Sequence, residues 1–283
     1  FTIHPEPDCS SETAGVGGVV PPWTPLRVRD REVHCWGRVY TFADGPFPSS
    51  LVSAGEDILI KPPRFAWRAG AQRGELGTGT LRISESSDSR VAFSGRMTDE
   101  LFQVDCSAEI EFDGAVFYEM TITPTQPIEK LDEFALEFML KPDAARFFLE
   151  GHAEHVSPER NVLPSQPGER VATKFLPMAA LCGDERGLQW FCQSDEGWTP
   201  YDRTDTMVME RKEDALLWRF NIKQGGSFTD ALHLRWGFLA TPVKPLARTR
   251  DHQRVVHFWP GGPVRATPEA FYRPQILDKV AAY

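Results

Sequence analysis

Apolar and polar residues alternate strictly over residues 102–112, and the alternation resumes over residues 116–122. The apolar positions are Phe102, Val104, Cys106, Ala108, Ile110 and Phe112, followed by Val116, Tyr118, Met120 and Ile122. A period of two is typical of a strand with one face in the core. Between the runs, Asp113-Gly114 favours a type I′ turn, which needs positive φ at both central residues. We therefore predict an antiparallel hairpin with one solvated face. The acidic residues on that face are Glu109, Glu111 and Glu119.

Two later segments show the same period. Residues 232–239 alternate apolar with mostly polar or small side chains, and Pro242 and Pro245 then end the strand because proline cannot donate to a sheet ladder. Residues 187–193 form a similar short run. Three tryptophans inside such runs are predicted to lie in the core. They are Trp190, Trp218 and Trp236.

The whole chain favours an all-β fold. Short apolar runs are separated by turn residues, with 23 prolines and 22 glycines in the chain. We find neither a sustained helical stripe nor a repeat of fixed period. We predict a large two-sheet antiparallel β-sandwich over residues 23–246. A flexible leader over residues 1–22 and an exit linker and tail over residues 247–283 flank it.

Charge and hydropathy exclude some classes of binding partner. The net charge of -9 and the pI near 5.3 argue against a nucleic-acid partner, which needs clustered Lys and Arg. No apolar run approaches the roughly 20 residues of a membrane span, so we predict none. The five cysteines form no disulfide pattern. The chain begins at Phe1 without signal-peptide features, so either a targeting segment of a secreted or periplasmic protein has been removed or the chain is part of a longer protein.

Three segments carry a resemblance to a known family: Trp-Gly-Arg-Val-Tyr-Thr-Phe at 36–42, Gly-Leu-Gln-Trp at 187–190 with Trp198, and Phe-Leu-Ala-Thr-Pro-Val-Lys-Pro-Leu at 238–246. They resemble the amino-terminal β-sandwich region of multidomain glycoside hydrolases related to glycoside hydrolase family 123. The resemblance implies an extended, mutarotase-like supersandwich that precedes a catalytic (β/α)8 barrel acting on N-acetylhexosamine-containing glycans. In that family an Asp-Glu pair on the barrel does the chemistry, and we carry that pair onto no residue of this chain.

Four adjacent acidic pairs are candidates for catalytic or binding residues. They are Asp99-Glu100, Asp132-Glu133, Asp184-Glu185 and Asp195-Glu196. The first three are interpreted as turn acids in solvent. The fourth lies between two tryptophans, and aromatic rings beside carboxylates are typical of sugar sites. Trp198 and Tyr201 lie in a polar loop and are predicted to be exposed, so that they can stack on a sugar or pack against an adjoining domain. The predicted carbohydrate-binding residues are therefore Asp195, Glu196, Trp198 and Tyr201.

The sequence gives little indication of a metal or cofactor site. His152 and His155 have ligand-type spacing but no identifiable third ligand, so we predict no metal site, and no motif indicates a cofactor. Three functions stay open. The first is an accessory sandwich of a glycoside hydrolase, with a carbohydrate ligand and a C-terminal catalytic barrel or other domain as partners. The second is a free-standing carbohydrate-binding module. The third is a self-contained polysaccharide hydrolase or lyase with its site on the sheet face.

Overall fold

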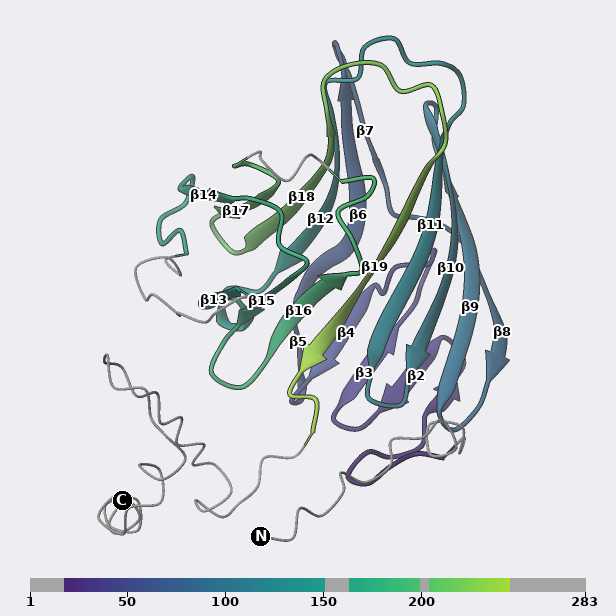
Figure 1. The fold of residues 1–283 in the computed structure, drawn as a ribbon. Helices are drawn as coiled ribbons and strands as arrows, with labels where there is room; N and C mark the ends of the chain where they lie inside the picture. Colours follow the sequence, from purple (N-terminus) through teal and green to yellow (C-terminus); the bar gives the residue numbers. More distant parts are fainter. Residues whose placement is uncertain (1–17, 151–162, 199–203, 245–283) are drawn as a thin grey trace, which may run out of the picture. The chain divides into compact units, whose positions relative to one another are not determined.

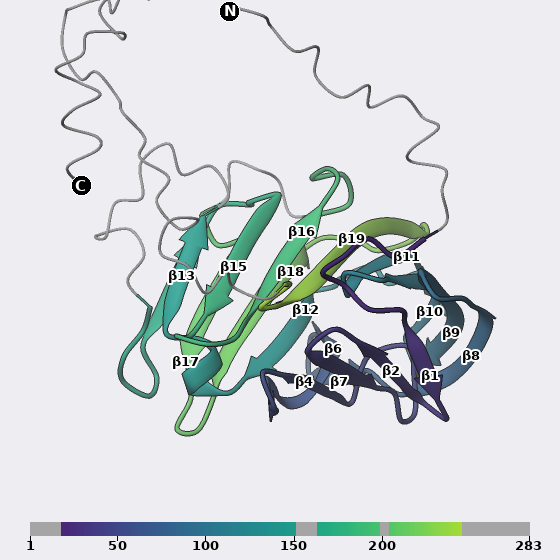
Figure 2. The same cartoon turned by 90° about the horizontal axis from the view of Figure 1, so that it is seen from below.

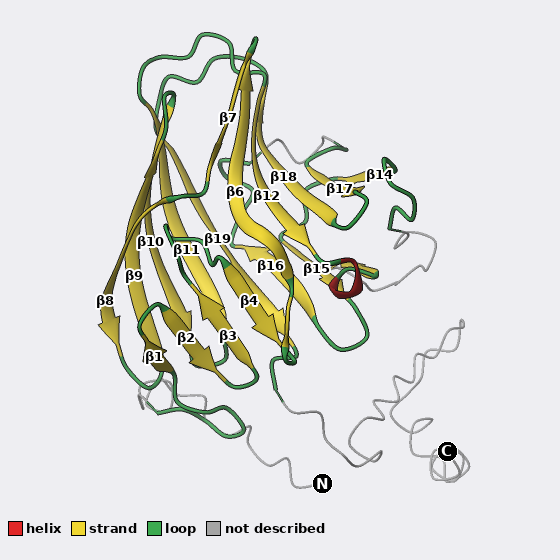
Figure 3. Cartoon of the chain, turned by 180° about the vertical axis from the view of Figure 1, so that it is seen from behind, coloured by secondary structure: helices red, strands yellow, loops and turns green. Residues whose placement is uncertain are grey.

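The structure is a computed structural model that describes residues 18–150, 163–198 and 204–244. The all-β prediction is confirmed: the described residues form nineteen strands and one short 3-10 helix, Pro142–Ala144 (Figures 1 and 3). All paired strands are antiparallel and belong to three sheets. The strands extend from residue 27 to residue 241, within the interval predicted for the sandwich. The predicted leader and tail lie mostly outside the described residues.

The largest sheet has eight strands in the order β13-β15-β16-β19-β11-β10-β9-β8. Its strands are β8 (Gly79–Ser86), β9 (Arg90–Thr98), β10 (Phe102–Glu111), β11 (Ala115–Pro124), β13 (Phe147–Glu150), β15 (Met178–Cys182), β16 (Gly187–Cys192) and β19 (Leu232–Thr241). The second sheet has six strands in the order β14-β17-β18-β12-β6-β7. These are β6 (Leu59–Ala69), β7 (Gln72–Leu76), β12 (Glu133–Leu140), β14 (Arg170–Thr173), β17 (Met207–Arg211) and β18 (Leu216–Gln224).

A third, five-stranded sheet was not predicted. It consists of β1 (Arg27–Arg29), β2 (Glu32–Cys35), β3 (Arg38–Thr41), β4 (Ser50–Ser53) and β5 (Glu56–Asp57). Figure 2 shows it beside the curved β8–β11 part of the largest sheet. Phe42 contacts Phe93 of the eight-stranded sheet, with ring centroids 5.0 Å apart. Phe47, in the loop before β4, lies 5.7 Å from Phe65 of the six-stranded sheet. The small sheet thus packs against both large sheets.

The core lies between the two large sheets and is aromatic. Phe102 and Phe134, from opposite sheets, have ring centroids 4.7 Å apart, and Phe138 meets Trp236 at 6.0 Å. The prediction that three tryptophans are buried is confirmed. Their exposed fractions are 0% for Trp190, 0% for Trp218 and 3% for Trp236. Large aromatic side chains supply much of the buried area that holds such sheets together.

The predicted hairpin is confirmed as β10–β11, but its turn differs from the prediction. Only Gly114 has positive φ, at +81°, whereas a type I′ turn would require it at Asp113 as well. The Gly114 amide donates to the Glu111 carbonyl at 2.8 Å, and the Asp113 carboxylate accepts from the Ala115 amide at 2.9 Å. The connection is a type I turn followed by a left-handed glycine, which suits a three-residue loop.

The three segments that carry the family resemblance meet in space. β16 pairs directly with β19, and Tyr40 of β3 lies 6.4 Å from Phe238 of β19. The end of β19 is also anchored to the small sheet. The buried Arg38 donates to the Ala240 carbonyl at 2.9 Å and to the Val243 carbonyl at 3.1 Å. The segment that leaves the sandwich is therefore held by side-chain hydrogen bonds.

Candidate functional site

The outward face of the eight-stranded sheet carries a groove of about 1250 Å³. The groove crosses five adjacent strands, β8, β9, β10, β11 and β19, and is bordered by the loop that follows β16. Side chains alternate along each strand, so one face holds the core and the other holds the groove. The apolar residues predicted on β10 and β11 point into the core, and the polar residues between them form this outward surface.

Strand register arranges these polar side chains in rows across the sheet. We define row 1 as Thr80, Arg96, Asp105, Thr121 and His233, which are cross-strand partners in that order. We define row 2 as Arg82, Ser94, Ser107, Glu119 and Arg235. Neighbouring strands are about 4.8 Å apart, so each row extends across roughly 19 Å. The rows therefore offer hydrogen-bonding groups over the length of a small oligosaccharide.

Four charged groups in the rows form two ion pairs that remain open to solvent. Arg96 contacts Asp105 at 2.6 Å, with side chains 57% and 41% exposed. Arg235 contacts Glu119 at 3.0 Å, with side chains 67% and 62% exposed. Exposed pairs of this kind contribute little to folding stability. Their donors and acceptors are thus accessible to a ligand.

A second part of the groove, of about 730 Å³, adjoins the first and is more apolar. Here the next row places Phe117 of β11 and Phe191 of β16 on either side of Gly237 of β19. The two rings have centroids 5.3 Å apart in an edge-to-face arrangement. A Cβ atom at Gly237 would lie 2.5 Å from the Phe191 ring, so only glycine lets this ring lie across β19. The two parts share five lining residues: Ser94, Ser107, Glu119, Gln193 and Arg235.

The loop after β16 contains the residues predicted to bind carbohydrate. Glu196 is exposed and lines the groove together with Gln193 and Ser194. Asp195 is exposed but does not line it. Tyr201 lies outside the described residues. The structure therefore brings Glu196 alone of the four to the groove among the residues that it describes.

The predicted exposure of Trp198 is wrong. Its side chain is 6% exposed and packs 5.4 Å from Trp190 and 6.3 Å from Phe220, measured between ring centroids. The polar sequence around it suggested solvent, but burying a large indole is favourable enough to draw it into the core. Trp198 therefore tethers the loop that carries Glu196, and its ring is not available as a sugar platform.

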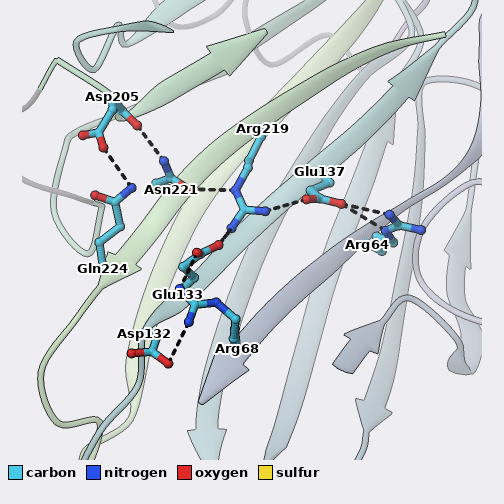
Figure 4. Close-up of polar contacts among 9 residues, drawn as sticks. All are labelled: Arg64, Arg68, Asp132, Glu133, Glu137, Asp205, Arg219, Asn221 and Gln224. Carbon is cyan, nitrogen blue, oxygen red and sulfur yellow. Dashed lines mark hydrogen bonds and ion pairs between the residues drawn. The ribbon is translucent and has the colours of Figure 1, made fainter. Parts of the chain in front are cut away.

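The outward face of the six-stranded sheet is also polar but has a different organisation (Figure 4). Charges of alternating sign contact one another in a continuous series, which we call the ladder. Its members are Glu75, Arg64, Glu137, Arg219, Glu133, Arg68 and Asp132. Glu137 is only 6% exposed and accepts from Arg64 at 3.0 Å and from Arg219 at 2.8 Å.

The ladder corrects the interpretation of Asp132-Glu133 as turn acids in solvent. Glu133 begins β12, and its carboxylate accepts from Arg68 at 2.8 Å and from Arg219 at 2.6 Å. Hydrogen bonding by Arg68, together with the charges of Arg219 and Arg68, lowers the pKa of Glu133. Such a carboxyl stays ionised near neutrality and is poorly suited to act as a general acid.

The pKa of Glu111, at the end of β10, is shifted in the opposite direction. Burial, followed by the negative charges of Asp113 and Glu109, raises the pKa of its carboxyl. Glu109 on the same face is paired with Arg90 at 2.6 Å. Glu111 lines neither part of the groove.

Sequence patterns missed the row residues because each looked like an ordinary solvated strand position. One signal was present: Phe117 is a large apolar residue on the polar face of its strand, between Ala115 and Glu119. Within the described ranges, no group of at least three His, Cys, Asp or Glu side chains is arranged to hold a metal ion. His152 and His155 lie outside those ranges. The described residues also include no helix long and apolar enough to span a membrane.

Part of the chain matches a known protein family. Residues 26–160 match the family model described as glycoside hydrolase 123, third domain. This interval contains the first of the three resembling segments, at 36–42, whereas the other two lie beyond it. No curated protein matches the chain.

Several solved structures are similar to the chain. The Slr1438 protein from Synechocystis sp. PCC 6803 has 10% identity and a TM-score of 0.44, over 77% of this chain and 95% of that chain. An alpha-mannosidase from Enterococcus faecalis V583 has 8% identity and a TM-score of 0.47, over 76% of this chain and 30% of that chain. A putative aldose 1-epimerase from Escherichia coli K12 has 9% identity and a TM-score of 0.44, over 77% and 98%.

The predicted family relationship is confirmed by the family model. The strands that it covers include the small sheet and β6 to β12, which supply much of the groove. The chain thus contains a carbohydrate-related β-sandwich domain, and its residues 26–160 are related to the third domain of glycoside hydrolase family 123.

Proposed function

We propose that this chain is the accessory β-sandwich of a glycoside hydrolase, and that its groove holds a glycan containing N-acetylhexosamine. A catalytic barrel that this chain does not contain would cleave the glycan. The observation that carries the proposal is the ordered set of exposed donors and acceptors in rows 1 and 2. A sugar presents many hydroxyl groups, and a site that binds it needs several convergent polar groups.

The charge of the groove supports a neutral ligand. Its lining includes three arginines, Arg82, Arg96 and Arg235, and three carboxylates, Asp105, Glu119 and Glu196. Positive and negative groups are therefore equal in number before His233 is considered. An N-acetylated sugar carries no charge and suits this balance, whereas an acidic polysaccharide would favour an excess of arginine.

An accessory role is supported by the anchored exit of the sandwich. Ser53 donates to the Thr241 carbonyl at 2.7 Å, and the Trp23 indole donates to the Val243 carbonyl at 2.9 Å, alongside the contacts of Arg38. A domain that positions a neighbour benefits from a fixed connection. The pairing of Asp105 and Glu119 with arginines also favours binding over acid catalysis in the groove.

The test is titration of the chain with tri-N-acetylchitotriose and with an N-acetylgalactosamine oligosaccharide by calorimetry, together with a hydrolysis assay on the same ligands. We expect binding without turnover. The Glu119→Gln and Arg235→Gln variants should each weaken binding about tenfold, which corresponds to about 1.4 kcal/mol. Asp44→Asn, a change at an exposed ion pair of the small sheet, is the matched control and should bind normally. An absence of binding would reject the glycan site, and turnover by this chain alone would reject the accessory role.

A further inference from the structure

We infer that Phe117 and Phe191 form an aromatic subsite that binds the apolar face of one sugar ring of the glycan. This inference rests on the proposed function, which it deepens by dividing the groove into a polar part and an aromatic part. The polar part would hold hydroxyl and acetamido groups through rows 1 and 2. The aromatic part would take the carbon-hydrogen face of the adjoining ring.

The first observation is the exposure of Phe117. Its side chain is 39% exposed at an outward strand position, where its row neighbour Glu109 and its strand neighbour Glu119 are charged. The exposed part of the Phe117 ring contributes no burial energy, so folding alone does not require an aromatic residue of this size there. Phe191 is half-buried and packs against the side of Phe117. The two ring centroids are 5.3 Å apart, and the ring planes meet at 63°.

The second observation is the surface on which the rings lie. Gly237 lies between Phe117 and Phe191 in the same cross-strand row. The absent side chain leaves room for the Phe191 ring, which would otherwise meet a Cβ atom at 2.5 Å. The aromatic surface therefore lies low on the sheet, so that a ligand can cover it while still reaching the polar groups beside it.

The third observation is the polar border. Glu119 and Arg235 belong to the row next to the two rings and line both parts of the groove, as does Gln193. Rows are two residues apart along a strand, about 7 Å, which is comparable with the size of one sugar ring. A pyranose ring has the same division, with carbon-hydrogen groups on its faces and hydroxyl groups at its edge. Aromatic surface with hydrogen-bonding groups at its border suits that chemistry.

A second exposed phenylalanine provides a control for nonspecific hydrophobic binding. Phe147 of β13 is 47% exposed on the same sheet, and it lines neither part of the groove. If any exposed phenylalanine on this sheet captured the ligand, both positions would matter. If the subsite is specific, only Phe117 will.

The experiment measures tri-N-acetylchitotriose and N-acetylgalactosamine oligosaccharide binding by calorimetry for Phe117→Ala, Phe117→Trp and Phe147→Ala, with thermal unfolding as the folding check. We expect Phe117→Ala to weaken binding about tenfold, and Phe117→Trp and Phe147→Ala to keep it within about twofold. Unchanged binding by Phe117→Ala, with weaker binding by Arg235→Gln, would overturn the aromatic subsite and leave the polar groove standing. Equal losses in Phe117→Ala and Phe147→Ala would also overturn it. Failure of the unmodified chain to bind would overturn the proposed function, and the subsite with it.

Discussion

The outward faces of the two large sheets have similar residue types but different organisation. On the six-stranded sheet, the ladder joins each carboxylate to at least one arginine, and Glu137, which contacts both Arg64 and Arg219, is buried (Figure 4). On the eight-stranded sheet, the two ion pairs of rows 1 and 2 are separate from each other and about half exposed. Polar composition alone therefore does not mark a binding site. Donors that are satisfied and covered stabilise the fold, whereas donors that remain open beside a groove are available to a ligand.

The largest effect is expected where the groove depends on the core. Trp198→Ala removes a buried indole that contacts Trp190, Phe220 and Phe175, and should lower the free energy of unfolding by about 3–5 kcal/mol. Urea denaturation at neutral pH measures this change. Glycan binding should also weaken because the loop with Glu196 loses its tether. Asp195→Asn, in the same loop, is the control and should leave unfolding unchanged. A small loss in Trp198→Ala would mean that the loop is held in another way.

The next effect separates the two faces directly. Glu137→Ala leaves Arg64 and Arg219 without their shared buried acceptor and should cost about 2–4 kcal/mol of stability, with little change in glycan affinity. Chemical denaturation and ligand titration of the same sample measure both quantities. Glu75→Ala, at the exposed end of the same ladder, should change stability by less than about 0.5 kcal/mol. If the two variants lost equal stability, the ladder would not be a cooperative network centred on Glu137.

On the eight-stranded sheet, we expect a mutation to change glycan affinity and to leave stability nearly unchanged. Glu119→Gln breaks the exposed pair with Arg235 and should change the free energy of unfolding by less than about 0.5 kcal/mol. Its effect should appear in ligand affinity instead. Thermal unfolding without ligand provides the measurement, with Glu137→Ala as the reference. A stability loss comparable to that of Glu137→Ala would erase the distinction between the two faces.

The smallest effects concern pH. The pKa of Glu133 is lowered in the fold, so its contribution is present above the unfolded value of about 4.5 and is lost as pH falls through the lowered folded value. The pKa of Glu111 is raised, so stability falls as pH rises from about 4.5 through the raised folded value. Glu111→Gln should therefore be more stable than the unmodified chain at neutral pH and lose this advantage below pH 4.5, whereas Glu133→Gln should be less stable at neutral pH.

Denaturation midpoints across this pH range test both signs. Glu109→Gln should bring the pKa of Glu111 back toward its ordinary value, because the Glu109 charge contributes to raising it. A Glu111→Gln variant that is destabilised at neutral pH would show that the carboxylate makes a favourable contact in the fold. In that case the ionised Glu111 carboxylate would stabilise the fold, as the ladder carboxylates do, and burial would not be its dominant influence.

Local patterns were sufficient for much of the fold. The β10–β11 hairpin, the β16 and β19 strands and the buried Trp190, Trp218 and Trp236 all follow from a two-residue period and from the preference of large apolar residues for the core. The turn type was less secure because Asp113-Gly114 suits more than one loop length. The small sheet was missed as a separate unit because its short strands resemble those of the sandwich.

The candidate site depended on information that local patterns do not contain. Asp105, Thr121 and His233 are far apart in the sequence and become neighbours only through the strand order β10-β11-β19 and its register. The same applies to Phe117 and Phe191, which meet across Gly237. Trp198 shows the converse, since its polar neighbours suggested exposure and packing against Trp190 decided otherwise.

The amino-acid sequence determined the class of fold, the core face of the main strands and the family relationship, because each depends on residue type and short-range periodicity. Tertiary structure alone decided which polar residues face one another, which are covered and which line the groove. The physical reason is that hydrogen bonding and burial depend on distances across strands, and strand order and register set those distances.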